Sequence, residues 1–206
     1  MRRIIGLTGN LGTGKTTVAA YARRLGIPVF DADQQARALL EPGSPVVTQV
    51  IEHFGPEVIQ AAGSLDRLAL AEIIFRDPQG RRWLEGVIHP EVRRAAEGFI
   101  QEHRDAVVIL DIPLLFEAEM TDLVNEIWVV TCGEEQQYQR LHQRHPHWSR
   151  EHIQARLAQQ WPLAEKIARA DVVLDNSGSL AQLEEAVEVA LGRASQEPKR
   201  TPEGTE

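Results

Sequence analysis

The sequence predicts an α/β fold in which helices cover both faces of a parallel sheet. Five short apolar runs alternate with stretches of helical periodicity, and they lie at Ile4–Leu7, Val29–Phe30, Val107–Leu110, Ile127–Val130 and Val172–Leu174. Runs that are apolar at nearly every position are typical of strands buried on both faces. The first run leads through a glycine-rich loop into a helical stretch, as the crossover between parallel strands requires.

The loop after the first apolar run matches the phosphate-binding pattern G-x-x-x-x-G-K-[ST]. It consists of Gly9, Asn10, Leu11, Gly12, Thr13, Gly14, Lys15 and Thr16. The glycines allow a tight turn whose N–H groups point at phosphate oxygens, and the following helix adds its positive N-terminal end. We therefore expect Lys15 to contact the β- and γ-phosphates of a nucleotide and the Thr16 hydroxyl to ligate Mg²⁺.

Two aspartates close the second apolar run, in the stretch Val29–Asp33. Ligands of open α/β sheets bind beyond the carboxyl ends of the strands, so a carboxylate here would face the phosphates. Strand alternation would put Asp31 and Asp33 on the same side. We expect Asp33 to orient an acceptor hydroxyl and take its proton, whereas Asp31 suits the N-cap of a helix over Gln34–Leu40.

About 75 residues separate the second apolar run from the third, far more than one crossover helix needs. This stretch predicts an inserted helical subdomain at about residues 34–104 that would hold a second substrate. The helical segments that we expect in it are Pro45–Phe54, Leu65–Phe75, Arg81–Ile88 and Glu91–His103, with Pro90 in the first turn of the last.

The third and fourth apolar runs are each followed by a residue whose side chain can bind a metal ion or react. Asp111 follows Val107–Leu110, and an aspartate at this place in a nucleotide site usually contacts Mg²⁺, directly or through water. Cys132 follows Ile127–Val130 and is the single cysteine, so no disulfide can form within the chain. We interpret it as a thiol at a strand end rather than a catalytic group.

A predicted helix over Glu134–His145 carries Arg140 and Arg144 four residues apart and therefore on one face. Arg150 and Arg156 follow beyond a proline-containing turn. Guanidinium groups suit phosphate oxygens, so we expect residues 136–169 to form a mobile lid that closes over the ATP phosphates. The alternative is an ordinary solvated charged face.

Four histidines in the same region invite the interpretation of a zinc site: His142, His145, His147 and His152. No cysteine accompanies them and they lack metal-ligand spacing, so we expect them to face solvent on the lid. The four tryptophans, at positions 83, 128, 148 and 161, are expected to be packing residues.

The last apolar run ends in Asp175 and Asn176, at the ligand edge of the sheet. An asparagine here can hydrogen-bond a nucleotide base, although an ordinary turn is the alternative. A capping box opens a helix at Ser179, which we expect to run towards Leu191 and end at Gly192. Residues 193–206 are polar and predict a disordered tail, so one domain at 1–192 is expected, with a core at about 1–33, 105–135 and 170–192.

Composition limits the class of protein. The formal net charge of −8 argues against a surface that coats nucleic acid, and no apolar run approaches the length needed to cross a bilayer. The phosphate-binding pattern begins too close to Met1 for a cleaved signal peptide to precede it. We expect a cytoplasmic enzyme that is monomeric and contacts neither membrane nor nucleic acid.

Taken together, the motifs resemble the dephospho-coenzyme A kinase family of the P-loop kinase superfamily. The resemblance spans the chain except its tail and rests on the phosphate loop, Asp31-Ala32-Asp33, Glu41-Pro42-Gly43, Leu65-Asp66-Arg67, His89-Pro90, Pro113-Leu114-Leu115-Phe116-Glu117, the Arg140/Arg144 pair, Gln160, and Ala170-Asp171 through Asn176. It departs mildly from the family's commoner wording of the loop at Asn10 and Leu11 and in having threonine in place of serine. These positions contribute mainly backbone groups.

The resemblance implies a five-stranded parallel core and ATP-dependent phosphorylation of the ribose 3′-hydroxyl of dephospho-coenzyme A. By that analogy Asp33 addresses the hydroxyl, Arg140 the ATP phosphates and Asn176 the base. It also assigns Arg67, His89, Leu114 and Glu117 to the acceptor substrate. Two alternatives stay open: a kinase of another small molecule, such as a nucleoside monophosphate, shikimate or gluconate, and a nucleotide-dependent regulatory protein, although no N-K-x-D guanine motif is present.

Overall fold

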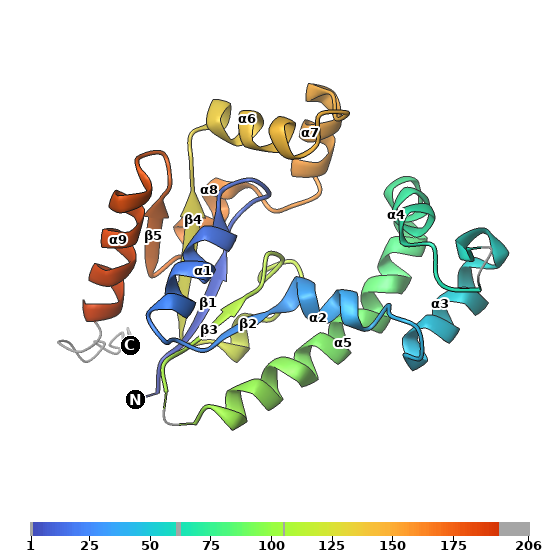
Figure 1. The fold of residues 1–206 in the computed structure, drawn as a ribbon, viewed down its shortest axis with the longest axis horizontal. Coiled ribbons are helices and arrows are strands. Elements are labelled where there is room, and N and C mark those ends of the chain that lie inside the picture. The colour runs from blue at the N-terminus through green and yellow to red at the C-terminus, as the bar shows by residue number, and fades with distance from the viewer. Residues whose placement is uncertain (1, 61–62, 105, 194–206) are drawn as a thin grey trace, which may run out of the picture.

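The computed structural model describes residues 2–60, 63–104 and 106–193, and its centre is a parallel sheet (Figure 1). The strands are β1 (Ile4–Thr8), β2 (Val29–Asp31), β3 (Val108–Asp111), β4 (Glu126–Thr131) and β5 (Val172–Asp175). They lie in the order β2-β3-β1-β4-β5, and every neighbouring pair is parallel. The predicted α/β class and the five-stranded parallel sheet are therefore confirmed. The strand that leads into the phosphate loop is central.

Helices α1 (Lys15–Arg24) and α9 (Leu180–Arg193) cover one face of the sheet. Alternate residues of the strands, such as Ile5 and Leu7, bury their side chains against them. The predicted capping box is present, since the Ser179 N–H donates to Gln182 Oε1 at 2.8 Å. The expected end of the helix at Gly192 is wrong, because Gly192 lies inside α9. The predicted tail at 193–206 lies outside the described residues apart from Arg193.

The opposite face of the sheet packs on the second half of α5 (Pro78–Glu102) and on the loop after β3. We expected two helices meeting at Pro90, and this is wrong because α5 runs through the proline without a break. An internal proline loses one backbone hydrogen bond. Packing outweighs that loss here, since Leu84 before the proline joins the core of the helical subdomain, and Ala96 after it joins the core below the sheet.

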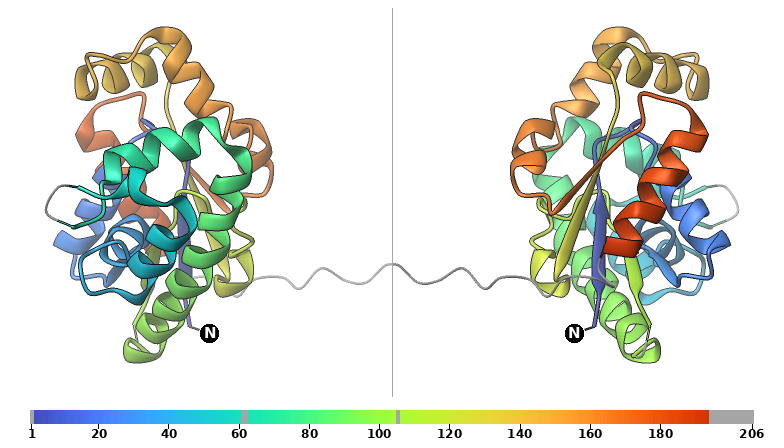
Figure 2. Two further views of the ribbon diagram at one scale, coloured as in Figure 1. Left: turned by 90° about the vertical axis from the view of Figure 1, so that its right-hand side faces the viewer. Right: turned by 90° about the vertical axis from the view of Figure 1, so that its left-hand side faces the viewer.

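The other helices of the subdomain are α2 (Ala32–Ala38), α3 (Pro45–Phe54) and α4 (Arg67–Arg76). Helices α3 and α4 enclose a small core of their own together with the first half of α5, whereas Ala32 and Ala36 of α2 pack in the core below the sheet. Figure 1 shows this subdomain beside the sheet with α5 joining the two, and in Figure 2 it faces the viewer in the left view and lies behind the sheet in the right view. The predicted helix over Pro45–Phe54 has these same bounds in the structure.

Helices α6 (Glu134–Arg144), α7 (Arg150–Leu157) and α8 (Leu163–Ala168) lie between β4 and β5 in the chain. We call residues 136–169 the lid. In Figure 1, α6 and α7 extend above the carboxyl ends of the strands, on the side where the phosphate loop lies. The short 3₁₀ helices η1 (Pro56–Val58) and η2 (Thr121–Leu123) complete the described elements. Within these elements no helix is long and apolar enough to cross a membrane.

Candidate active site

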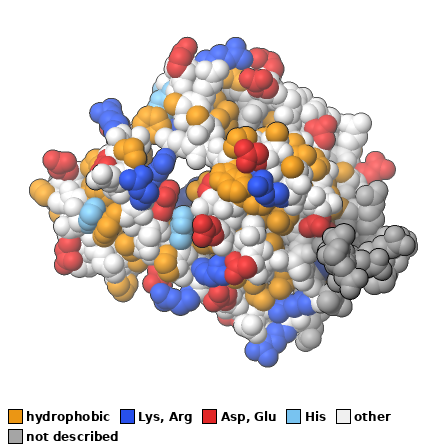
Figure 3. Space-filling model, turned by 180° about the vertical axis from the view of Figure 1, so that it is seen from behind, with side chains coloured by type: hydrophobic (Ala, Val, Ile, Leu, Met, Phe, Trp, Pro, Cys, Tyr) orange, Lys and Arg blue, Asp and Glu red, His pale blue; other side chains and the backbone are white. Residues whose placement is uncertain are grey.

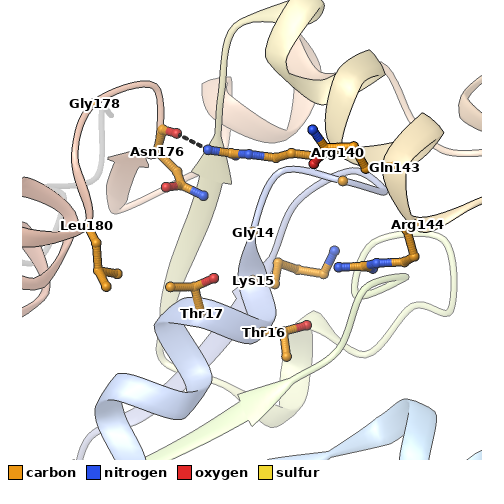
Figure 4. Close-up of a pocket in the computed structure, with 11 residues that line it drawn as sticks. Gly14, Lys15, Thr16, Thr17, Arg140, Gln143, Arg144, Asn176, Gly178 and Leu180 are labelled. Atoms are coloured by element: carbon orange, nitrogen blue, oxygen red, sulfur yellow. Dashed lines mark hydrogen bonds between the residues drawn. The ribbon is translucent and has the colours of Figure 1, made fainter.

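A cavity of about 640 Å³, called the loop cavity below, lies over the phosphate loop (Figure 4). Its walls come from the loop, the start of α1, the helix α6 and the turn after β5. The lining residues used below are Gly14, Lys15, Thr16, Arg140, Arg144 and Asn176. The loop cavity thus collects predicted nucleotide residues from three separate segments, which are the loop with the start of α1, the helix α6 and the turn after β5.

The loop needs glycines because of its backbone conformation and because neighbouring atoms leave no room for a Cβ. Gly9, Gly12 and Gly14 have φ angles of 146°, 83° and 102°, which residues with a Cβ rarely adopt. A Cβ on Gly9 would overlap the Val130 carbonyl oxygen, and one on Gly14 would overlap the Asn176 side chain. The pattern read from the sequence therefore reflects real close approaches of the backbone.

Side chains from distant segments hold the loop in this shape. Asn176 Nδ2 donates to the Thr13 carbonyl oxygen at 2.8 Å, and Arg140 Nη2 donates to the Asn176 carbonyl oxygen at 2.9 Å. The Leu11 N–H donates to Gln160 Oε1 at 2.8 Å. Asn176 is therefore bound to the loop itself, and its expected contact with the nucleotide base stays a prediction.

Lys15 is surrounded by groups that set its charge. Its ammonium donates to the Gly9 carbonyl oxygen at 2.7 Å. Burial lowers the pKa of Lys15, while the nearby carboxylates of Asp111 and Asp33 act in the opposite direction. The loop therefore holds a cation between two carboxylates that the sequence had placed after two different strands.

Asp31 and Asp33 do not lie on one strand, contrary to our expectation. β2 ends at Asp31, whose carboxylate accepts from the Gln34 N–H at 2.8 Å and caps α2. Asp33 lies in the first turn of that helix. The expectation that strand alternation puts Asp31 and Asp33 on the same side was therefore wrong. Burial raises the pKa of Asp33, and repulsion from Asp31 adds to the rise.

Asp111 is the last residue of β3 and is paired in register with Asp31 of β2 and Leu7 of β1. Its side chain is buried, and its Oδ1 atom has no hydrogen-bond partner among the described residues. Burial raises the pKa of Asp111 to about 7. A buried, unpartnered carboxylate oxygen on a residue near Lys15 of the loop fits the hard oxygen ligands that Mg²⁺ prefers.

A second cavity of about 310 Å³, called the helical cavity below, lies between the helical subdomain and the lid. Figure 3 shows that face of the molecule hollowed between these parts, with basic, acidic and histidine side chains around the hollow. The lining residues used below are Leu11, Arg81, Glu85, His89, Leu114 and Arg156.

The structure brings together only some of the residues that the resemblance assigned to the acceptor. His89 and Leu114 line the helical cavity, as expected of that assignment. Arg67 begins α4 and forms an ion pair with Glu41, and it lines neither cavity. Sequence reasoning missed Arg81, which carried no signal beyond its helical spacing.

Glu117 lies in the loop after β3 and forms a buried ion pair with Lys166 of α8, whose Nζ is 2.8 Å from Glu117 Oε1. The same oxygen accepts from the Trp161 N–H at 2.8 Å, and Asn10 Nδ2 donates to the Trp161 carbonyl oxygen at 3.3 Å. Glu117 Oε2 is buried without a described partner. The sequence analysis assigned no role to Lys166, whose side chain is fully buried.

The four lid arginines lie in three different places. Arg140 and Arg144 line the loop cavity, but Arg156 lines the helical cavity. Arg150 is exposed and pairs with Glu135 at 2.9 Å. Arg150 and Arg156 lie on α7 rather than α6 and do not line the loop cavity, and the expected closure of the lid over the ATP phosphates stays a prediction.

The histidines of the lid also differ from expectation. His142 and His147 are exposed, as predicted, but His145 and His152 are half-buried and stack on Trp148 at ring distances of 3.8 and 5.2 Å. Among the described residues no three histidine, cysteine, aspartate or glutamate side chains form a group that could hold a metal ion. These histidines serve packing in this conformation.

Known proteins resemble this chain along most of its length. The family model for dephospho-CoA kinase matches residues 3–182. A dephospho-CoA kinase of Gloeobacter violaceus is 52% identical over 194 residues, covering 94% of each chain. One of Synechocystis is 48% identical over 185 residues, covering 89% of this chain and 92% of the relative.

Solved structures agree in fold. A crystal structure from Thermus thermophilus has a TM-score of 0.79 at 39% identity, covering 93% of this chain and 97% of the other. A dephospho-CoA kinase of Campylobacter jejuni has a TM-score of 0.71 at 25% identity, covering 95% and 98%. A shikimate kinase of Bacteroides thetaiotaomicron, at 16% identity with a TM-score of 0.54 and coverage of 94% and 98%, shares the fold alone. With a family model matched over residues 3–182 and relatives near half identity, the chain belongs to the dephospho-CoA kinase family.

Proposed function

We propose that this protein transfers the γ-phosphoryl group of ATP to the ribose 3′-hydroxyl of dephospho-coenzyme A, giving coenzyme A and ADP in the last step of coenzyme A biosynthesis. The observation that carries the proposal is the pair of cavities that meet at the phosphate loop. Leu11 belongs to that loop and lines the helical cavity, while Gly14 and Lys15 line the loop cavity. A donor and an acceptor can therefore approach each other across the loop.

The loop cavity supplies the donor site. Backbone N–H groups of the loop and the start of α1 would bind the ATP phosphates. Lys15 places a cation beside Asp33 and Asp111. Arg140 and Arg144 bring guanidinium groups from the lid, where charge develops on the transferred phosphoryl.

Asp33 and Glu117 supply the groups for the acceptor hydroxyl. The raised pKa of Asp33 makes this carboxylate a stronger base than an exposed aspartate, as the removal of a proton from the hydroxyl requires. Glu117 Oε2 is buried and unpartnered, so it can accept a hydrogen bond from the bound acceptor. Lys166 fixes the other oxygen of Glu117 and so fixes its direction.

We further propose that Thr16 and Asp111 hold Mg²⁺. The ion would neutralise part of the charge on the β- and γ-phosphates when bound. The unpartnered Oδ1 atom of Asp111 supports this assignment. Deprotonation of Asp111, whose pKa is about 7, prepares it as a ligand.

A substrate panel tests the proposed function. ADP release by the full chain is followed with ATP, Mg²⁺ and one acceptor at a time: dephospho-coenzyme A, shikimate, gluconate or a nucleoside monophosphate. We expect turnover with dephospho-coenzyme A and background with the others. Lys15→Ala is the matched control and should abolish turnover while the protein stays folded, as judged by circular dichroism. Turnover of another acceptor at a higher kcat/KM would refute the assignment.

A further inference from the structure

Arg156 is a partly desolvated cation with no anionic partner. Its guanidinium lies over the ring of Trp148 at 4.4 Å and over the ring of Phe75 at 5.1 Å. Its Nε donates to His152 Nε2 at 2.9 Å, so this contact is also to a neutral group. No carboxylate of a described residue forms an ion pair with Arg156, and burial lowers its pKa. A cation held in this way is ready for an anion from outside the chain.

Arg81 lines the same cavity from the helical subdomain. Its Nε atom is buried without a hydrogen-bond partner among the described residues, and Glu85 Oε1 lies 3.7 Å away, too far for a hydrogen bond. His89, also in the lining, has its pKa lowered by burial, which favours the neutral imidazole. The charged groups of the helical cavity are therefore two guanidinium groups and one carboxylate, Arg81, Arg156 and Glu85.

We propose that Arg81 and Arg156 bind the diphosphate bridge of the acceptor substrate. This inference rests on the proposed function, in which dephospho-coenzyme A carries a diphosphate ester at the 5′ side of its ribose. Each phosphate of that bridge is an anion, and guanidinium groups match phosphate oxygens with two parallel hydrogen bonds. The ATP phosphates belong to the loop cavity, which neither arginine lines. Glu85 offsets one positive charge, and the three groups together still leave an excess of positive charge that attracts an anion.

The lid is already in contact with the subdomain at this point. Phe75 belongs to α4 and stacks on His152 of α7 at 5.3 Å with the rings nearly parallel at 2°. Arg156 is held by this stack before a ligand arrives, so less side-chain entropy is lost on binding. Discrimination follows, because an acceptor without a diphosphate leaves both guanidinium groups unpaired.

Binding measurements on the full chain test the proposal. Isothermal titration gives Kd for dephospho-coenzyme A with the donor site filled by a non-hydrolysable ATP analogue, and Kd for that analogue alone. The variants are Arg156→Gln and Arg81→Gln. The matched control is Arg82→Gln, an exposed neighbour that lines neither cavity.

We expect each cavity variant to weaken dephospho-coenzyme A binding by about 10- to 100-fold, the usual effect of losing a charged hydrogen bond. The affinity for the ATP analogue and both affinities of Arg82→Gln should stay within about twofold. Added salt should weaken dephospho-coenzyme A binding by the wild type more than by Arg156→Gln. If Arg156→Gln does not fold, Arg156→Lys replaces it. We then expect a smaller loss of affinity for dephospho-coenzyme A, because lysine keeps the charge but lacks the forked guanidinium group.

An unchanged affinity for dephospho-coenzyme A in the folded variants would overturn the proposal. So would an equal loss for the ATP analogue, which would assign Arg156 to the donor phosphates. Failure of the wild type to bind dephospho-coenzyme A at all would instead refute the proposed function and this inference with it.

Discussion

Replacing Asp111 by asparagine should stabilise the metal-free protein while abolishing its activity. The carboxylate is 7% exposed, its Oδ1 atom has no partner among the described residues, and its pKa is raised from 3.8 to about 7. Between these two values the unfolded chain releases the proton and the folded chain keeps it. The unfolded state then binds fewer protons, so the contribution of Asp111 to stability falls as pH rises.

The magnitude follows from the size of the shift. Three pKa units at about 1.4 kcal/mol each set a ceiling of about 4 kcal/mol above pH 7. Lys15 loses an attractive neighbour in Asp111→Asn, which offsets part of the gain. We therefore expect the variant to be more stable than the wild type by about 1–3 kcal/mol at pH 8, and by much less at pH 5.

Urea denaturation of both proteins without divalent cations, at pH 5 and at pH 8, measures this difference. The wild type should lose stability relative to Asp111→Asn as pH rises. A variant that is no more stable than the wild type at pH 8, or a gap that is the same at both pH values, would refute the reasoning. Kinase activity of the variant should be lost at both, because a proposed Mg²⁺ ligand is gone.

Three further predictions concern the ion pair, the aspartates and the lid. Lys166→Met leaves the buried Glu117 carboxylate without its cation, so the free energy of unfolding should fall by about 3–5 kcal/mol. Adding Glu117→Gln to this variant should recover part of the lost stability. Urea denaturation measures both variants, and wild-type stability of Lys166→Met would contradict the prediction. Asp33→Asn should lower kcat by about 10² to 10⁴ with little change in ATP affinity. Asp31→Asn should keep most of kcat, and a loss confined to Asp31→Asn would reverse the roles. Arg140→Ala should lower kcat by about 10³ and affect ATP affinity less, in steady-state kinetics and titration; full kcat would exclude it from transition-state stabilisation.

The parts of the site that could be predicted from the sequence are those encoded by local pattern. The phosphate loop needs glycine at fixed places, so its spacing alone locates it, and Asp111 follows from a buried strand that ends at the ligand edge. The predicted cap at Asp31 is confirmed, and the catalytic role of Asp33 stays a prediction. The expected strand geometry of the two aspartates was wrong, because the helix begins at Ala32 rather than at Gln34.

What could not be predicted depends on contacts between distant segments. Lys166 and Glu117 are 49 positions apart in the numbering and meet only when α8 packs against β4. Arg156 looked like another lid arginine, because periodicity places a residue on a helix face but not against a particular cavity. The continuity of α5 through Pro90 likewise depends on distant contacts. Both halves of the helix pack into cores, and this packing outweighs the tendency of proline to end a helix.

The central claim, phosphoryl transfer to the 3′-hydroxyl of dephospho-coenzyme A, is tested most directly by following the phosphoryl group itself. The full chain is incubated with Mg²⁺, dephospho-coenzyme A and ATP labelled at the γ-phosphate, and the products are separated and treated with a 3′-nucleotidase. Our account predicts that the label elutes with coenzyme A and is released by the 3′-nucleotidase, and that Lys15→Ala gives no labelled product. Label found only in inorganic phosphate, or in a product that resists the 3′-nucleotidase, would contradict it.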